Sequence, residues 1–169
     1  MIPWEYWGCF LMLGAAFVTD IKSMKIPNVI TMTGMAAGLC YHSITSSGSG
    51  VLFAIKGAGI GFVLMFVLYL LRAVGGGDVK LFAGIGAWLG TGLTLSTMMY
   101  SIFAAGCIGL VILIWRREAL TRLRRVARTV LGAVILRSVT PIQSAAQGQL
   151  QFPFMLAVLP GAILSVYYF

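Results

Sequence analysis

The chain has 169 residues, of which 60% are apolar and only 9% charged, and its 12 Lys and Arg against 4 Asp and Glu give a formal net charge of +8. Soluble domains carry roughly a quarter charged residues, so this composition excludes an ordinary water-soluble globule and places most of the chain in lipid. The basic excess favours a cytoplasmic membrane face over a nucleic-acid-binding surface.

Long apolar runs along the chain predict an all-α polytopic membrane protein with about six transmembrane helices. Because a spanning helix needs about 20 apolar residues, these helices leave no room for a second soluble domain, and we expect residues 1–169 to form a single transmembrane domain. The first run lacks the basic start and small-residue cleavage site of a signal peptide, so we expect it to remain as a span. The runs cover about residues 3–19, 27–44, 51–74, 79–95, 97–115 and 152–169.

The connectors between these runs differ in charge, and this difference predicts the orientation. Residues 43–50 and 91–97 form connectors without charge. Under the positive-inside rule the basic connectors are cytoplasmic, so both termini lie on the other side of the membrane. The basic connectors contain Lys22, Lys25, Arg72, Lys80 and seven arginines between residues 116 and 137.

Residues 116–137 are the most polar segment of the chain. Their apolar residues recur every three or four positions, which predicts a basic amphipathic helix on the cytoplasmic membrane surface, with its arginines facing anionic headgroups, in a basic loop of about residues 116–150. An acidic protein partner or nucleic acid is the alternative, but no aromatic residue interleaves the arginines, so we expect no nucleic-acid binding. The periodic residues are Leu120, Leu123, Val126, Val130 and Val134.

Other residues receive structural interpretations. The cysteines lie in apolar stretches without a Cys-x-x-Cys pair, and we interpret them as packing residues rather than disulfide partners or metal ligands. The only histidine, His42, lies toward the outer face and is interpreted as an interfacial bystander. Gly-x-x-x-Gly pairs indicate close helix packing. The cysteines are Cys9, Cys40 and Cys107, and the glycine pairs are Gly34/Gly38, Gly57/Gly61 and Gly86/Gly90.

The only two aspartates, Asp20 and Asp78, fall at the same cytoplasmic edge in the predicted topology. An ionisable group at membrane depth is costly and indicates function. Two simpler interpretations stay open: Asp20 is an interfacial carboxylate offset by Lys22, and Asp78 caps the N-terminus of its helix. The glycines before Asp78 give the backbone more freedom than a cap needs, both for positive φ and for close approach of another backbone. They are Gly75, Gly76 and Gly77.

Two carboxylates that share a site cannot both ionise easily, so one keeps a proton while the other acts as a base, as in aspartic proteases. Such a pair can activate water to hydrolyse a peptide bond. In the alternative, the protein is a non-enzymatic transporter or proton relay whose two carboxylates bind a cation or carry protons. That alternative predicts polar residues strung across the spans and helices broken at mid-depth. A structural membrane subunit would instead tolerate loss of both aspartates.

The segments around both aspartates resemble the motifs of type IV prepilin peptidases. The string GGGDVKL, from Gly75 to Leu81, resembles that family's Gly-x-Gly-Asp motif, and Asp20 followed by IKSMKIPN is similar to its first catalytic aspartate. The resemblance covers nearly the whole chain. It implies an aspartic endopeptidase of the bacterial inner membrane, with its active site facing the cytoplasm. By motif matching, Asp20 and Asp78 are catalytic, and Gly75, Gly76, Gly77 and Lys80 bind substrate.

The substrate that the resemblance implies is a type IV prepilin or pseudopilin, whose short basic leader is removed after a glycine. The compact chain resembles the peptidases of tight-adherence (Flp) pilus systems, and archaeal preflagellin peptidases share the chemistry. Larger family members carry paired cysteines associated with N-methylation from S-adenosylmethionine. Such pairs are missing here, so we expect no N-methyltransferase activity, no cofactor and no metal.

Three further matches carry less defined chemistry. Pro27 and Asn28 match the first motif by position alone. Lys80 matches the lysine after the second aspartate, and three roles stay open for it: steering substrate, tuning Asp78 or anchoring at the cytoplasmic edge. Near the C-terminus, the family's Pro-Phe/Tyr-Gly stretch appears as Phe152-Pro153-Phe154-Met155, without the glycine.

Overall fold

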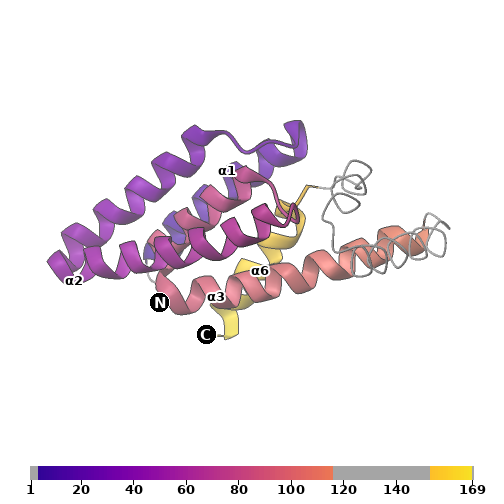
Figure 1. The fold of residues 1–169 in the computed structure, drawn as a ribbon. Helices are drawn as coiled ribbons and strands as arrows, with labels where there is room; N and C mark the ends of the chain where they lie inside the picture. Colours follow the sequence, from indigo (N-terminus) through magenta and orange to yellow (C-terminus); the bar gives the residue numbers. More distant parts are fainter. Residues whose placement is uncertain (1–3, 116–152, 169) are drawn as a thin grey trace. The chain divides into compact units, whose positions relative to one another are not determined.

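The structure is a computed structural model that describes residues 4–115 and 153–168. Every element in this part of the chain is an α-helix, which confirms the all-α class (Figure 1). The predicted surface helix and basic loop, residues 116–150, lie outside the described residues. The helices are α1 (Trp4–Ser23), α2 (Asn28–Leu70), α3 (Gly76–Trp115) and α6 (Met155–Tyr168).

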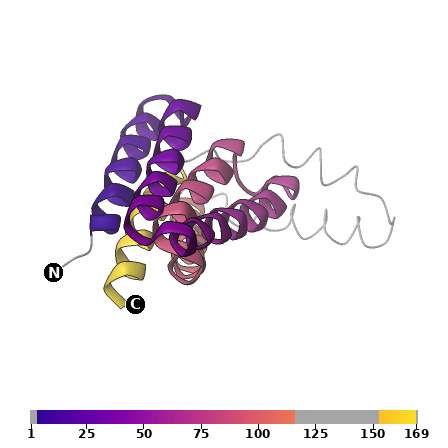
Figure 2. The same cartoon turned by 90° about the vertical axis from the view of Figure 1, so that its left-hand side faces the viewer.

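The chain divides into two compact units, one of Met1–Ala105 with Pro153–Phe169 and one of Gly106–Phe152. All contacts described below belong to the first unit. Within it, α6 lies beside α1, although these helices stand at opposite ends of the sequence (Figure 2). The expected single transmembrane domain stays a prediction.

Helix α2 covers the second and third predicted spans and changes direction between them. Its backbone leaves the helical region at Ser47, where φ is 50° and ψ is −135°, so the predicted connector of residues 43–50 is a sharp break rather than a loop. Figure 1 shows the two halves of α2 diverging from this break. Gly50 permits their close approach, because a Cβ there would collide with the carbonyl oxygen of His42.

Helix α3 breaks at Gly90, where φ is 70° and ψ is −170°. The predicted connector of residues 91–97 is therefore wrong, since those residues are helical and the chain turns just before them. Glycine takes this left-handed φ without steric cost. The buried Thr94 hydroxyl donates to the Gly90 carbonyl at 2.5 Å, so this buried polar group has a partner within its own helix. The weakly polar stretch is thus part of a helix, in which Thr94 and Thr97 are buried.

His42 is a buried hydrogen-bond donor, so its interpretation as an interfacial bystander is wrong. Its side chain is only 5% exposed, and its Nε2 lies 3.0 Å from the carbonyl oxygen of Trp88. Because a carbonyl can only accept, Nε2 carries the proton. Trp88 lies in the last turn before the break at Gly90, where carbonyls lack helical donors. His42 therefore supplies a donor that the broken helix cannot.

His42→Ala is expected to lower the free energy of unfolding by about 1–3 kcal/mol, because it leaves the Trp88 carbonyl buried without this donor. Thermal unfolding in detergent, followed by circular dichroism, measures the loss. Ser43→Ala is the matched control, since Ser43 is exposed and its hydroxyl bonds the Leu39 carbonyl of its own helix. Equal melting temperatures for the two variants would contradict the role given to His42.

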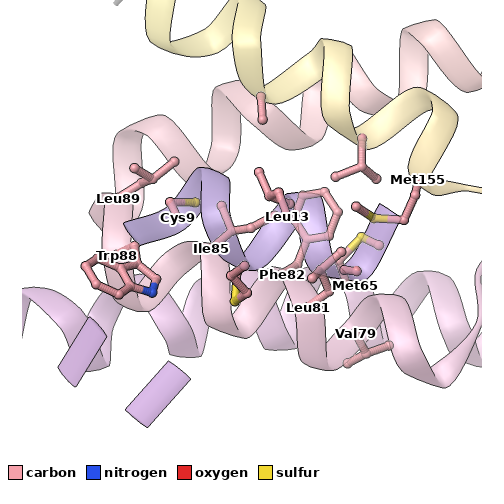
Figure 3. Close-up of a cluster of buried hydrophobic side chains, with 14 residues drawn as sticks. Cys9, Leu13, Met65, Val79, Leu81, Phe82, Ile85, Trp88, Leu89 and Met155 are labelled. Carbon is pink, nitrogen blue, oxygen red and sulfur yellow. The ribbon is translucent and has the colours of Figure 1, made fainter. Parts of the chain in front are cut away.

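A buried core joins all four described helices (Figure 3). Leu13 of α1, Met65 of α2, Phe82 of α3 and Met155 of α6 are each 0% exposed. Burial of large apolar side chains is the main favourable term in folding, at about 1.5–3 kcal/mol for each. The core therefore holds the start of α6 and the first half of α3 against α1.

The close packing predicted for the Gly-x-x-x-Gly pairs is confirmed. A Cβ on Gly57 would collide with the carbonyl oxygen of Gly86, and one on Gly61 would collide with that of Phe82. In the reverse direction, a Cβ on Gly86 would collide with the carbonyl oxygen of Gly57. The second half of α2 and the first half of α3 thus touch backbone to backbone.

The three cysteines are free, and they do not share one environment. Cys9 is buried in the core, which confirms its interpretation as a packing residue. Cys40 and Cys107 are exposed, so their side chains face outward and contribute little to the packing of the described helices.

Two helical stretches, Asn28–Leu70 and Gly76–Ile112, are long and apolar enough to cross a membrane. Large apolar side chains also cover the outside of the described helices, and a surface of this kind suits lipid or a partner rather than water. Examples are Leu11, Ile44, Leu70, Phe103 and Tyr167.

Candidate active site

Asp20 lies in the last turn of α1, and the helix ends shortly after it. Met24 adopts a left-handed φ of 50° and donates its N–H to the Asp20 carbonyl at 2.8 Å, a cap that turns the chain toward α2. The Asp20 side chain is 6% exposed. Its Oδ2 accepts a hydrogen bond from the Met155 N–H at 3.1 Å, so this partner of the carboxylate comes from α6 and not from Lys22.

Asp78 lies in the first turn of α3 and is 8% exposed. Its Oδ2 accepts a hydrogen bond from the Gly75 N–H at 3.0 Å, while its own N–H donates to the Gly75 carbonyl at 3.1 Å. This reciprocal pair caps the start of the helix. The capping role considered for Asp78 is therefore present, in the same side chain that the resemblance assigns to catalysis.

The two aspartates come together at one end of the first unit. The carboxylates of Asp20 and Asp78 are close enough for their charges to interact. The segments that carry them also touch, because a Cβ on Gly77 would lie 3.3 Å from the Cβ of Ile26 in the α1–α2 connector. Within residues 4–115 and 153–168, the recorded hydrogen bonds engage Oδ2 of each carboxylate, and none engages Oδ1.

The glycines before Asp78 provide space rather than unusual torsion angles. Gly76 and Gly77 belong to the first turn of α3, and among the described glycines positive φ occurs only at Gly90. A Cβ on Gly75 would lie 3.3 Å from Oδ2 of Asp78. The expected use of positive φ is therefore wrong, since a regular helix begins here, whereas the expected close approach of another segment is present.

Lys80 joins the two sequence motifs. Its Nζ donates a hydrogen bond to Oδ1 of Asn28 at 2.8 Å. Asn28 is the first residue of α2 and follows the connector that leaves Asp20. The sequence alone did not indicate this contact of Asn28. The bond brings the Lys80 ammonium group, which follows Asp78, next to the motif that follows Asp20.

Lys80→Met and Asn28→Ala are each expected to lower the free energy of unfolding by about 0.5–1.5 kcal/mol, the usual contribution of one hydrogen bond. Because both remove the same bond, the double variant should lose no more than the larger single loss. Thermal unfolding of the four proteins measures this coupling. Lys25→Met is the control, since it removes an exposed cation from the same end of the unit. Additive losses would contradict the link.

Helix α2 ends close to these glycines. Arg72 adopts a left-handed φ of 58°. The Arg72 N–H donates to the Tyr69 carbonyl and the Ala73 N–H to the Leu68 carbonyl, both at 2.9 Å. This is a Schellman end, in which glycine usually takes the left-handed position. An open pocket of about 380 Å³ lies at the C-terminal end of α2, and its lining residues precede Gly75 in the sequence. It is lined by Tyr69, Leu70, Arg72 and Val74.

Sequence reasoning missed the contribution of α6 to this site. The donor to Asp20 is the backbone N–H of Met155, and a backbone group leaves no residue-type signature. The signal that could have indicated it was the stretch Phe152-Pro153-Phe154-Met155, which resembles a family motif without its glycine and ends at the donor; Phe152 itself lies outside the described residues.

The comparisons with known proteins agree with the motifs. The sequence profile of the type IV leader peptidase family matches residues 7–114, which include both aspartates. A prepilin leader peptidase/N-methyltransferase of Pectobacterium carotovorum subsp. carotovorum is 31% identical over 121 residues, covering 65% of this chain and 42% of that protein. A protein of the same name from Neisseria gonorrhoeae is 30% identical over 134 residues, covering 70% of this chain and 46% of that protein.

A third relative with this name, from Bacillus subtilis (strain 168), is 34% identical over 97 residues, covering 54% of this chain and 38% of that protein. The chain thus spans less than half the length of these curated relatives. No solved structure is significantly similar to the chain.

Proposed function

Since the chain belongs to the type IV leader peptidase family, we propose that it is an aspartic endopeptidase that removes the leader of type IV prepilins or pseudopilins. The proposal assigns catalysis to Asp20 and Asp78. The observation that carries it is the juxtaposition of two buried carboxylates from different helices, each with one oxygen unused by the described residues.

The reaction needs one carboxylate as base and one carboxyl group as acid, and two neighbouring carboxylates favour this shared-proton state. The base takes a proton from water while the water oxygen bonds to the scissile carbonyl carbon. The acid hydrogen-bonds the carbonyl oxygen and stabilises the tetrahedral intermediate. The C–N bond then breaks as the leaving amine receives a proton.

The proposal assigns the glycines and Lys80 to the substrate. Gly75, Gly76 and Gly77 have no Cβ, and an extended peptide can therefore approach Asp78 closely. Lys80 has two roles in this proposal: it contacts the substrate, and it donates a hydrogen bond to Asn28. The preferred substrate in this proposal is a Flp-type prepilin cut after glycine.

The proposed location is the bacterial inner membrane, with about six spans, the aspartates at the cytoplasmic side and both termini outside. The breaks at Ser47 and Gly90 support six spans, because they divide α2 and α3 into two segments each. The orientation is supported by the basic residues near the aspartates and by the positive-inside rule. Anionic lipid headgroups are the proposed partners of the basic loop.

The transporter alternative predicted broken helices and polar residues within the spans. The breaks are present, and Thr94, Thr97 and Ser101 form a short run of buried hydroxyls in α3. None of these hydroxyls titrates in the physiological range, and Ser101 donates to the Thr97 carbonyl of its own helix at 2.6 Å. Because both aspartates lie at helix ends outside this run, the peptidase explains the placement of the carboxylates better.

The test is to express the full chain with a Flp-type prepilin in a bacterial host that lacks a prepilin peptidase, and to measure the mass of the pilin. We expect leader removal after glycine, and none with the vector alone. An uncleaved prepilin at normal membrane levels of the protein would contradict the proposal. A prepilin from another type IV system in the same assay tests the substrate preference.

The same mass measurement tests the expectation of no N-methyltransferase activity. With S-adenosylmethionine added, the new N-terminus is expected to stay unmodified, because the chain has no paired cysteines of the kind associated with methylation in larger family members. A pilin heavier by one methyl group would contradict this expectation and leave the peptidase assignment intact.

A further inference from the structure

We propose that the backbone N–H of Met155, at the N-terminus of α6, is a positioning group of the active site that holds the Asp20 carboxylate in its catalytic orientation. The inference rests on the proposed function and adds to it a part of the chain far from either motif. Met155 donates to Oδ2 of Asp20 at 3.1 Å, across 135 positions of sequence. It acts through Asp20 and is not itself a catalytic residue.

The Met155 N–H is free to make this bond because of its place in the helix. Met155 is the first residue of α6, and the first N–H groups of a helix have no intrahelical partner. The next ones are already used: Leu156 donates to the Pro153 carbonyl at 3.1 Å, and Ala157 donates to the Phe154 carbonyl at 2.9 Å. The Met155 N–H is thus the first donor that α6 offers, and it is directed at Asp20.

The surroundings of this bond make it strong. Asp20 is 6% exposed and Met155 is 0% exposed, so little water competes for either group. A hydrogen bond to an ionised carboxylate is roughly twice as strong as a neutral one, and the positive end of the α6 dipole adds to it. An orientation fixed in this way lets Asp20 present its other oxygen to water without reorganisation.

The two aspartates are therefore held in different ways. Asp78 receives its hydrogen bond from Gly75 in its own first turn, so its orientation is set locally. Asp20 lies at the end of α1 and depends on a remote helix for the corresponding bond. The core side chain of Met155 anchors that helix (Figure 3). Activity is thus coupled to the placement of α6.

The test separates the N–H of Met155 from its side chain. Met155→Pro removes the N–H at the first position of a helix, where proline is tolerated. Met155→Ala removes the side chain and keeps the N–H, so it is the matched control. We expect Met155→Pro to lower kcat for prepilin cleavage about ten- to a hundredfold relative to Met155→Ala, with KM changed less than about threefold. Equal kcat values for the two variants would overturn the proposal.

A second pair of measurements covers the case in which Met155→Pro does not fold. Replacement of the amide by an ester at residue 155 removes the same N–H without a proline ring, and the same loss of kcat is expected. A thermal double-mutant cycle of Asp20→Ala, which removes the acceptor, with Met155→Ala and with the ester tests the bond apart from activity, since only the ester should couple to Asp20. Equal coupling would overturn the contact. Failure of the wild type to cleave would instead overturn the proposed function and, with it, the catalytic role of the bond.

Discussion

Asp20→Asn and Asp78→Asn are each expected to slow leader removal about 10²- to 10⁴-fold, the range that a positioned acid–base group contributes. Asparagine has nearly the same shape as aspartate, and its amide oxygen can still accept the hydrogen bond from Met155 or Gly75. It cannot exchange a proton near neutral pH. The fold is therefore expected to survive while the chemistry is lost.

The measurement is the single-turnover rate of prepilin cleavage in detergent or vesicles, at equal amounts of folded protein. Because the aspartates act as one unit, the double variant is expected to be no slower than the slower single variant. Glu5→Gln is the control, since it removes an acidic group from the first turn of α1, at the other end of that helix. A rate above about a tenth of the wild-type value in either asparagine variant would contradict the mechanism.

Gly86→Ala is expected to destabilise the protein by about 3 kcal/mol, the upper part of the usual range for an overpacked core. A methyl group there meets the carbonyl oxygen of Gly57, and a backbone group cannot move aside as a flexible side chain can. The first half of α3, which carries Asp78, would then separate from α2. Thermal unfolding in detergent measures the loss, and a lower cleavage rate should accompany it.

Gly59→Ala is the matched control, because a Cβ on Gly59 meets nothing within 4 Å and the residue is exposed on the same helix as Gly57. Its melting temperature is expected to equal or exceed that of the wild type, since alanine favours a helix over glycine. Equal destabilisation by Gly86→Ala and Gly59→Ala would mean that backbone contact between α2 and α3 does not limit stability.

Much of the fold could be predicted because lipid leaves a simple pattern in sequence. Apolar runs located the helical segments, except that the turn between the fourth and fifth runs was placed at residues 91–97 and not at Gly90. Charge in alternate connectors predicted which helix ends share a side. That was enough to bring Asp20 and Asp78 together, although they lie on different helices. The uncharged connector at residues 43–50 was also located. The sequence did not indicate that the connector consists of a single non-helical residue, Ser47, between two helical segments.

The remaining features depend on backbone groups, which every residue shares. The break at Gly90 was missed because glycine is frequent in this chain. The polar residues after it suggested a turn, whereas they belong to a helix in which Thr94 and Thr97 are buried. His42 looked isolated because its partner is a carbonyl oxygen. Met155 was overlooked for the same reason, since its contribution to Asp20 is an N–H.

At Arg72, which adopts a left-handed φ, the residue that would give the greatest stability differs from the residue that favours one membrane orientation. Glycine there would relieve a backbone cost of about 1 kcal/mol, so a search for thermostable variants would select it. In the proposed topology, the same substitution would also remove a cation from a cytoplasmic connector, where few basic residues set the orientation of the chain. A variant selected for stability at this position would then be less uniformly oriented in the membrane.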